Sequence, residues 1–278
     1  LKYLEVDDNG RVKIDDLEEM LIKYCGKVKY VTISGASNVT GYLNDIRRAA
    51  RLAHKYGAHI IVDGAQLVAH KKISMLGVKS DENIDYLVFS AHKMYAPFGS
   101  GAIIGLKKTF NYYPPDILGG GIVYMVRDDG QVYLDTPEKN EPGTPNFFGA
   151  VAMAQAIKDM ETIGFRTIEE NEKNIFSRLL QGMKSIDNIR LYGDCKNIDD
   201  RLGIMVFNID GMSYEEVGER LANIRGIAVR QGGFCAHPYT RRLLGINDKD
   251  LDEYIGKNGI PGMVRVSLGI YNTEKEVD

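Results

Sequence analysis

Short apolar runs alternate with longer, more polar segments along residues 1–106. Four of these runs are rich in Val, Ile and Leu: "KVKYVTIS" (27–34), "AHIIVDGAQ" (58–66), "DYLVFSAHK" (85–93) and "GAIIGL" (101–106). Nearly continuous apolar runs are typical of strands that are buried on both faces, as in a parallel sheet. Between the first two runs, "NDIRRAARLAHKYG" (44–57) has apolar residues at helical spacing, with Asn44 as its N-cap and Gly57 as its end. The order strand, helix, strand predicts a βαβ unit in an α/β fold.

The pattern changes after residue 106. Residues 107–145 are rich in Gly, Pro and Tyr, which predicts a long loop that is functional or lies at an interface. "FFGAVAMAQAIKDMETIG" and "EENEKNIFSRLLQGMKSI" then predict two consecutive helices. Beyond them, "GIMVFNID", "IAVRQGG" and "MVRVSLGIYN" predict strands around a helix that begins at a Ser213–Glu216 capping box. We therefore expect a large domain over residues 1–175 and a smaller α+β domain over 176–278.

Composition narrows the class of protein. Hydrophobic residues make up 44% of the chain and charged residues 26%, which is ordinary for a globular protein in water. The net charge of −3 provides no basic surface for nucleic acid or for a membrane. The apolar runs are shorter than the roughly 18 residues that a spanning helix needs. The 3 widely spaced cysteines fit a reducing compartment, so we expect a cytoplasmic protein. Because the chain starts at Leu1 without Met, we also expect a piece of a longer protein.

Polar side chains follow two of the predicted strands where each strand ends. Asp63 and Gln66 follow one run, and Ser90, His92 and Lys93 follow the next. Because ligands of α/β sheets bind at the carboxyl ends of parallel strands, we expect these five side chains to share one cleft. Singly, each has an ordinary structural explanation, such as a turn cap or a solvated lysine. Together they match pyridoxal phosphate, which presents a pyridine nitrogen, an aldehyde and a phosphate.

The motifs that carry these residues resemble a known family. "VDGAQ" (62–66) and "SAHKMYAPFGSG" (90–101) are similar to the class V aminotransferases, which are fold-type I pyridoxal phosphate enzymes. Four further segments resemble family motifs in the family order: "SGASNVTGYLNDI", "EPGTPN", "VRQGGFCAHP" and "VRVSLGIYNTEKEVD". Within the family, the chain looks most like cysteine desulfurases and selenocysteine lyases. The resemblance implies a mostly parallel sheet with flanking helices and a smaller C-terminal α+β module.

The resemblance also implies a role for each residue at the strand ends. Lys93 would form the Schiff base with pyridoxal phosphate and then carry the proton at the substrate Cα. Asp63 would pair with the pyridinium nitrogen, and Gln66 would donate a hydrogen bond to the phenolic oxygen. Ser90 and His92 would hold the phosphate.

Residues further along the chain complete the implied site. Asn38 would lie near the ring and the substrate carboxylate. Arg265 would bind that carboxylate through its planar fork, with Arg230 as a secondary candidate. Thr144 would reach the phosphate of the cofactor in a neighbouring subunit, which implies a homodimer.

Cys235 decides the reaction. A free cysteine is most often a small buried hydrophobe. Cys235, however, follows the glycine-rich segment "RQGGF", which predicts an exposed thiol that a nearby Arg230 or a protonated pyridoxal system could activate as a nucleophile. The resemblance then implies a desulfurase that takes sulfur from cysteine as a Cys235 persulfide, releases alanine and passes the sulfur to an acceptor protein.

Three departures from the family keep alternatives open. Relatives usually have histidine where this chain has Phe234, and the segment between Cys235 and Arg265 is longer than expected. The N-terminal segment that stacks on the pyridine ring and binds the phosphate is not found, so we expect one wall of the pocket to be open and the chain alone to bind cofactor poorly. The alternatives are an aminotransferase or epimerase acting on another amino acid, and a non-catalytic homologue.

Overall fold

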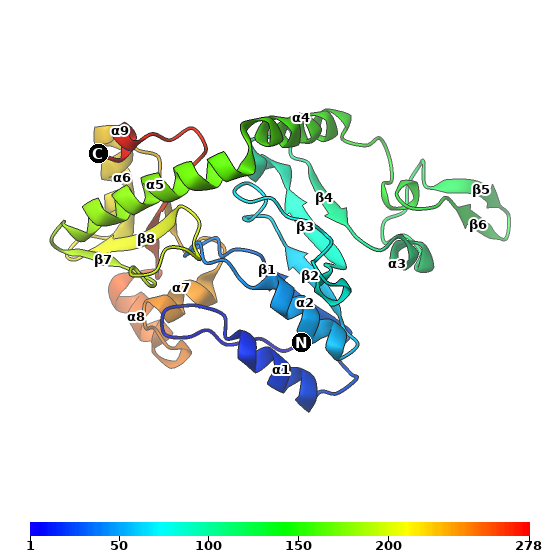
Figure 1. Cartoon of the computed structure of the whole chain (residues 1–278), viewed down its shortest axis with the longest axis horizontal. Coiled ribbons are helices and arrows are strands. Elements are labelled where there is room, and N and C mark those ends of the chain that lie inside the picture. The colour runs from blue at the N-terminus through cyan, green and yellow to red at the C-terminus, as the bar shows by residue number, and fades with distance from the viewer.

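The structure is a computed structural model that describes all residues 1–278. It contains two four-stranded sheets joined by long helices, and a two-stranded hairpin that projects from the body (Figure 1). The first sheet has the order β1 (Tyr30–Ser34), β2 (His59–Asp63), β3 (Tyr86–Ser90) and β4 (Gly101–Ile104). Strands β1, β2 and β3 run parallel. The prediction of an α/β fold is confirmed.

The fourth strand runs antiparallel to β3, not parallel as its apolar pattern suggested. Only the short segment between Ser90 and Gly101 connects the two strands, and a parallel crossover needs a dozen or more residues. β4 is also less buried than a central strand, since Ile103 and Ile104 are both exposed.

Helices cover one face of the first sheet and form the main core. The predicted helix between the first two strands is α2 (Ile46–Lys55), and α1 (Ile14–Lys23) packs beside it. Ile60 and Val62 of β2 are fully buried in this core. Asp45 caps α2 by accepting a hydrogen bond from Arg48 N at 2.9 Å. The expected cap, Asn44, instead donates to Ser34 O at 2.8 Å and ties the loop to β1.

The predicted loop of residues 107–145 contains regular structure. It forms the short helix α3 (Lys107–Tyr112) and a hairpin of β5 (Val123–Arg127) and β6 (Gly130–Tyr133), seen at the right of Figure 1. The loop prediction was wrong over these residues because Gly and Pro at both ends hid two strands of only four or five residues. Most side chains of the hairpin are exposed, including Tyr124 and Val126.

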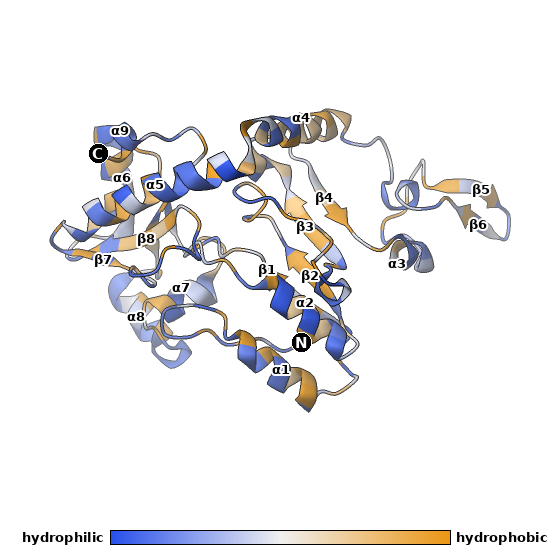
Figure 2. Cartoon of the chain, viewed as in Figure 1, coloured by the Kyte–Doolittle hydropathy of each residue, from blue (hydrophilic) through white to orange (hydrophobic).

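The two predicted helices that follow are α4 (Phe147–Ile163) and α5 (Phe165–Lys184). α5 extends from the first sheet to the second (Figure 1). A domain boundary at residue 175 would fall inside this helix, and it stays a prediction. No helix of the structure is both long and apolar enough to cross a membrane. Figure 2 shows apolar residues concentrated in the strands, while α5 is mostly hydrophilic.

The second sheet is antiparallel, with the order β7 (Ile189–Leu191), β8 (Ile204–Ile209), β10 (Met263–Ser267) and β9 (Arg230–Gly232). Four helices accompany it: α6 (Tyr214–Arg225), α7 (His237–Leu243), α8 (Leu251–Asn258) and α9 (Glu274–Val277). Ser213 caps α6 by accepting a hydrogen bond from Glu216 N at 3.2 Å, which is half of the predicted capping box. The prediction of a C-terminal α+β module is confirmed.

The core around β2 generates a stability prediction. Ile60 is fully buried, so Ile60→Ala removes apolar contacts and leaves a cavity. We expect the free energy of unfolding to fall by about 2–5 kcal/mol. Val78, which is 97% exposed, provides the matched control, and Val78→Ala should change it by less than about 0.5 kcal/mol. Urea unfolding measures both; an equally small effect at Ile60 would contradict this core assignment.

Candidate functional site

The ends of β2 and β3 bring polar side chains to one edge of the first sheet. Asp63 is the last residue of β2, and its Cα partner on the parallel β3 is Val88, two residues before Ser90. A short 3₁₀ turn (Ala91–Met94) follows and carries Lys93. The Asp63 carboxylate accepts a hydrogen bond from Ala65 N at 2.9 Å, which fixes its position while it remains exposed. The predicted convergence at the strand ends is therefore present for Asp63, Ser90 and Lys93.

Lys93 lies among charges from both sheets. Its ammonium is half-buried, and this loss of hydration lowers its pKa below the ordinary lysine value. The Asp63 carboxylate and the Cys235 thiol act to raise the pKa of Lys93, while the Arg265 guanidinium acts to lower it. These four side chains come from β2, the turn after β3, β10 and the loop after β9. The fold thus assembles in one place groups that are far apart in the sequence.

Arg265 is the most deeply buried cation of this cluster. Its Nη1 donates a hydrogen bond of 2.7 Å to Asn38 O, and its guanidinium carbon lies 5.4 Å from the centre of the Phe234 ring. Its Nε is buried and has no hydrogen-bond partner. Burial lowers the pKa of Arg265, and so does the like charge of Arg230, its register partner on β9. Nε is thus a buried donor without a hydrogen bond, while the Arg265 side chain as a whole stays partly exposed.

The loop after β9 presents Cys235. Phe234 and Cys235 both have left-handed backbone conformations, with φ of 54° and 58°. Such conformations persist only where surrounding contacts hold them. Here Asn38 Nδ2 donates to Phe234 O at 2.7 Å, and the Phe234 ring is buried at 5% exposure. With Phe234 turned inward, Cys235 is turned outward and is exposed, as the glycine-rich segment predicted.

The cluster carries positive charge without counterions. No ion pair within 4.0 Å includes Lys93, Arg230 or Arg265. Half-buried cations are usually paired, so Lys93 and Arg265 call for an anionic ligand, while Arg230 is exposed. A ligand with a carboxylate or a phosphate would give the partly exposed Arg265 guanidinium a counterion. These residues fit both pyridoxal phosphate and an amino acid.

Several expected cofactor residues have no hydrogen bond or ion pair to Lys93 or Arg265: Gln66, Ser90, His92 and Thr144. Of these, His92 and Thr144 are exposed. Their phosphate-binding roles stay predictions. Asn38, by contrast, contacts both Arg265 and the Cys235 loop through the hydrogen bonds described above.

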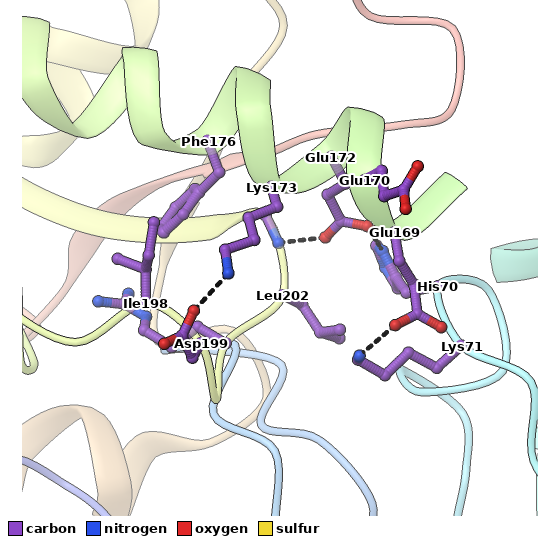
Figure 3. Close-up of a pocket in the computed structure, with 12 residues that line it drawn as sticks. His70, Lys71, Glu169, Glu170, Glu172, Lys173, Phe176, Ile198, Asp199 and Leu202 are labelled. Atoms are coloured by element: carbon purple, nitrogen blue, oxygen red, sulfur yellow. Dashed lines mark hydrogen bonds and ion pairs between the residues drawn. The ribbon is translucent and has the colours of Figure 1, made fainter. Parts of the chain in front are cut away.

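Gln66 has a partner that the sequence did not suggest. Its amide nitrogen lies 3.3 Å from Nε2 of His70, a buried residue that lines a cavity of about 230 Å³ beside α5 (Figure 3). His70 sits four residues after Gln66 in the apolar segment "LVAH". That helical spacing from a predicted cofactor residue was the one available signal, but a histidine in an apolar run usually indicates only the core.

Comparison with known proteins identifies similar chains. The family described as Aminotransferase class-V matches residues 1–278. The chain is 31% identical over 279 residues to a cysteine desulfurase of Cronobacter sakazakii and 32% identical over 278 residues to a probable cysteine desulfurase of Halalkalibacterium halodurans. Both alignments cover 100% of this chain and 62% of the relative, so the chain spans less than two thirds of their length.

The fold has the same likeness. The apo structure of a cysteine desulfurase from Thermococcus onnurineus NA1 superposes with a TM-score of 0.85 at 29% identity. The superposition covers 100% of this chain and 63% of the desulfurase chain. The fold that the sequence motifs implied is therefore confirmed.

The half-buried ammonium of Lys93 generates a pH-dependent prediction. Because burial lowers its pKa, the folded chain binds this proton less tightly than the unfolded chain does. The protonated Lys93 side chain therefore destabilises the folded chain at pH 7. This destabilisation disappears as the pH rises past the unfolded lysine pKa of about 10.4. We expect Lys93→Met to increase the free energy of unfolding at pH 7, and the gain to shrink near pH 10.

Urea unfolding without added pyridoxal phosphate measures this effect at both pH values. Lys108 is exposed, so Lys108→Met is the matched control and should change the free energy of unfolding by less than about 0.5 kcal/mol. A Lys93→Met chain that is less stable than the parent at pH 7 would contradict the assignment.

Proposed function

The chain belongs to the class V aminotransferase family, and from that premise we propose that it forms the greater part of a pyridoxal-phosphate-dependent cysteine desulfurase. The observation that carries the proposal is the exposed thiol of Cys235 among the unpaired cations Lys93 and Arg265. An aminotransferase needs the lysine and the arginine but has no use for this thiol. The relatives named cysteine desulfurase support the same choice.

The residues at the strand ends would hold the cofactor. Bound there, pyridoxal phosphate supplies an aldehyde that condenses with amines and a ring that withdraws electrons. The Asp63 carboxylate would keep the pyridine nitrogen protonated, and Gln66 would donate a hydrogen bond to the phenolic oxygen. Ser90 and His92 would bind the phosphate.

Arg265 would bind the substrate. Nη1 is committed to Asn38 O, while the buried Nε has no partner. The partly exposed planar fork of the guanidinium can donate two parallel hydrogen bonds to the α-carboxylate of an amino acid. Asn38 would hold that arginine from behind. Arg230, on the neighbouring strand, would add positive charge at the carboxylate.

Lys93 and Cys235 would carry out the proton and sulfur transfers. The lowered pKa of Lys93 makes a neutral amine easier to reach, as a general base at the substrate Cα requires. The Cys235 thiolate would attack the substrate sulfur, so that an S–S bond forms as the C–S bond breaks. The electron pair of the broken bond passes to the carbon fragment, which takes up protons and leaves as alanine. The sulfur remains as a persulfide on Cys235, ready for an acceptor protein.

We also propose a homodimer. The β5–β6 hairpin and the start of α4 expose large apolar side chains: Tyr124, Met125, Val126, Phe147 and Phe148. Exposed apolar surface on this scale is typical of an interface. Thr144 lies between these two elements, where a neighbouring subunit's cofactor phosphate could meet it.

The sulfur transfer is tested by removing one thiol. With pyridoxal phosphate and L-cysteine, we expect the full-length protein to release alanine and to build up a persulfide. Cys235→Ala should lower alanine release at least a hundredfold while pyridoxal phosphate still binds. Cys25 is also exposed, so Cys25→Ala is the matched control and should keep full activity. A Cys235→Ala protein with full alanine release would favour aminotransferase or epimerase chemistry, and a full-length protein that binds no pyridoxal phosphate would favour a non-catalytic homologue.

Binding of the carboxylate is tested at Arg265. Arg265→Lys keeps the charge but removes the planar fork, which should cost a charge-assisted hydrogen bond of about 1.5–3 kcal/mol. We expect KM for L-cysteine to rise about tenfold to a hundredfold. Arg190→Lys, in an exposed ion pair with Asp210, is the control and should leave KM unchanged. An unchanged KM for Arg265→Lys would exclude this carboxylate site.

A further inference from the structure

His70 is a buried imidazole whose two nitrogens both have partners. Its side chain is 7% exposed, and its Nδ1 lies 2.7 Å from Oε2 of Glu172 on α5. Its Nε2 lies 3.3 Å from the amide nitrogen of Gln66. Figure 3 shows the His70 ring directly against the Glu172 carboxylate at the wall of the cavity. The three side chains form a continuous chain of hydrogen bonds from α5 to the turn after β2.

The chemistry of these groups fixes where the protons lie. An ionised carboxylate only accepts hydrogen bonds, so Nδ1 of His70 must donate to Glu172. In the neutral ring, Nε2 then holds a lone pair and accepts a hydrogen bond from the Gln66 amide. One N–H of Gln66 is used in this way. The other N–H and the carbonyl oxygen of the amide remain available to a ligand.

The Glu172 carboxylate is itself held in place. Its Oε1 accepts a hydrogen bond from Gly203 N, just before β8, while Oε2 faces His70. A methyl group at residue 203 would lie 2.9 Å from this carboxylate, so only glycine leaves room for it. The relay therefore starts at the second sheet and ends at the first.

We propose that His70, held by Glu172, is a positioning residue that orients the Gln66 amide for the cofactor's phenolic oxygen. This inference rests on the proposed function for the identity of the ligand. The hydrogen-bond relay itself belongs to the cofactor-free chain. A merely structural role for His70 would stabilise the fold without acting through Gln66, and the two roles can be separated by experiment.

A double-mutant cycle on cofactor affinity makes the separation. The dissociation constant of pyridoxal phosphate is measured by its absorbance change in the full-length protein and in His70→Ala, Gln66→Ala and the double variant. We expect each single change to weaken binding about threefold to tenfold, and the double variant to bind no more weakly than Gln66→Ala alone. If the two effects multiply instead, His70 does not act through Gln66 and the proposal fails.

Two further variants control for damage to the fold. Glu172→Gln removes the charge but keeps the side-chain volume, and it should also weaken binding about threefold. Glu169→Gln removes the same charge from the same helix and cavity, but its partner is Lys71, so binding should not change. Equal losses in both variants would show a general charge effect and would overturn the relay.

Nitrogen NMR of the cofactor-free protein tests the relay without any ligand. We expect the His70 ring to be the neutral tautomer with its proton on Nδ1, and the Glu172→Gln variant to lose this preference. A proton on Nε2 in the parent protein would contradict the proposal. If the protein binds no pyridoxal phosphate, the proposed function fails, and this measurement still decides whether the relay exists.

Discussion

Positive charge held without a counterion is the constraint on which this site depends. Lys93 and Arg265 are partly removed from water, and this burial lowers the pKa of both; the Arg265 charge lowers the pKa of Lys93 further. Such an arrangement costs stability in the free protein, because neither cation has a carboxylate within ion-pair distance. The cost makes sense if the site binds an anion, since the ligand then supplies the missing partner. Asp63 is the one acidic group among them, and its carboxylate accepts a hydrogen bond from Ala65 N.

The two sheets are joined by the same loops that form the site. Asn38 lies in the loop after β1 and makes two hydrogen bonds to the second sheet. Its backbone O accepts from Arg265 Nη1, and its Nδ2 donates to Phe234 O in the loop that carries Cys235. Arg201, which is buried, ties the loop after β1 to β8 by donating to Thr40 O and Ile204 O, both at 3.0 Å. A strained cysteine loop, a buried arginine and a polar loop thus stabilise one another. The proposed sulfur transfer therefore depends on contacts between the sheets as much as on the reactive groups.

The polar residues at the strand ends could be predicted from the sequence because a buried strand and its end have a clear local pattern of apolar and polar residues. Asp63 and Lys93 follow apolar runs, and their convergence follows from the geometry of parallel strands. The direction of β4 was not readable, because an apolar run does not reveal its partner and the short connection after Ser90 decided it. The β5–β6 hairpin was missed because its strands are short and flanked by Gly and Pro. His70 was missed because its role depends on Glu172, which is 102 residues away and meets it only in the folded chain.

The identity of the amine that binds the cofactor tests the account most directly. The full-length protein is mixed with pyridoxal phosphate, reduced with borohydride to trap the cofactor on the lysine with which it has condensed, and digested for peptide mass spectrometry. The account predicts that the label lies on Lys93, within "SAHKMYAPFGSG", and that it disappears in Lys93→Ala. A label on another lysine, or no label in a folded protein, would contradict it.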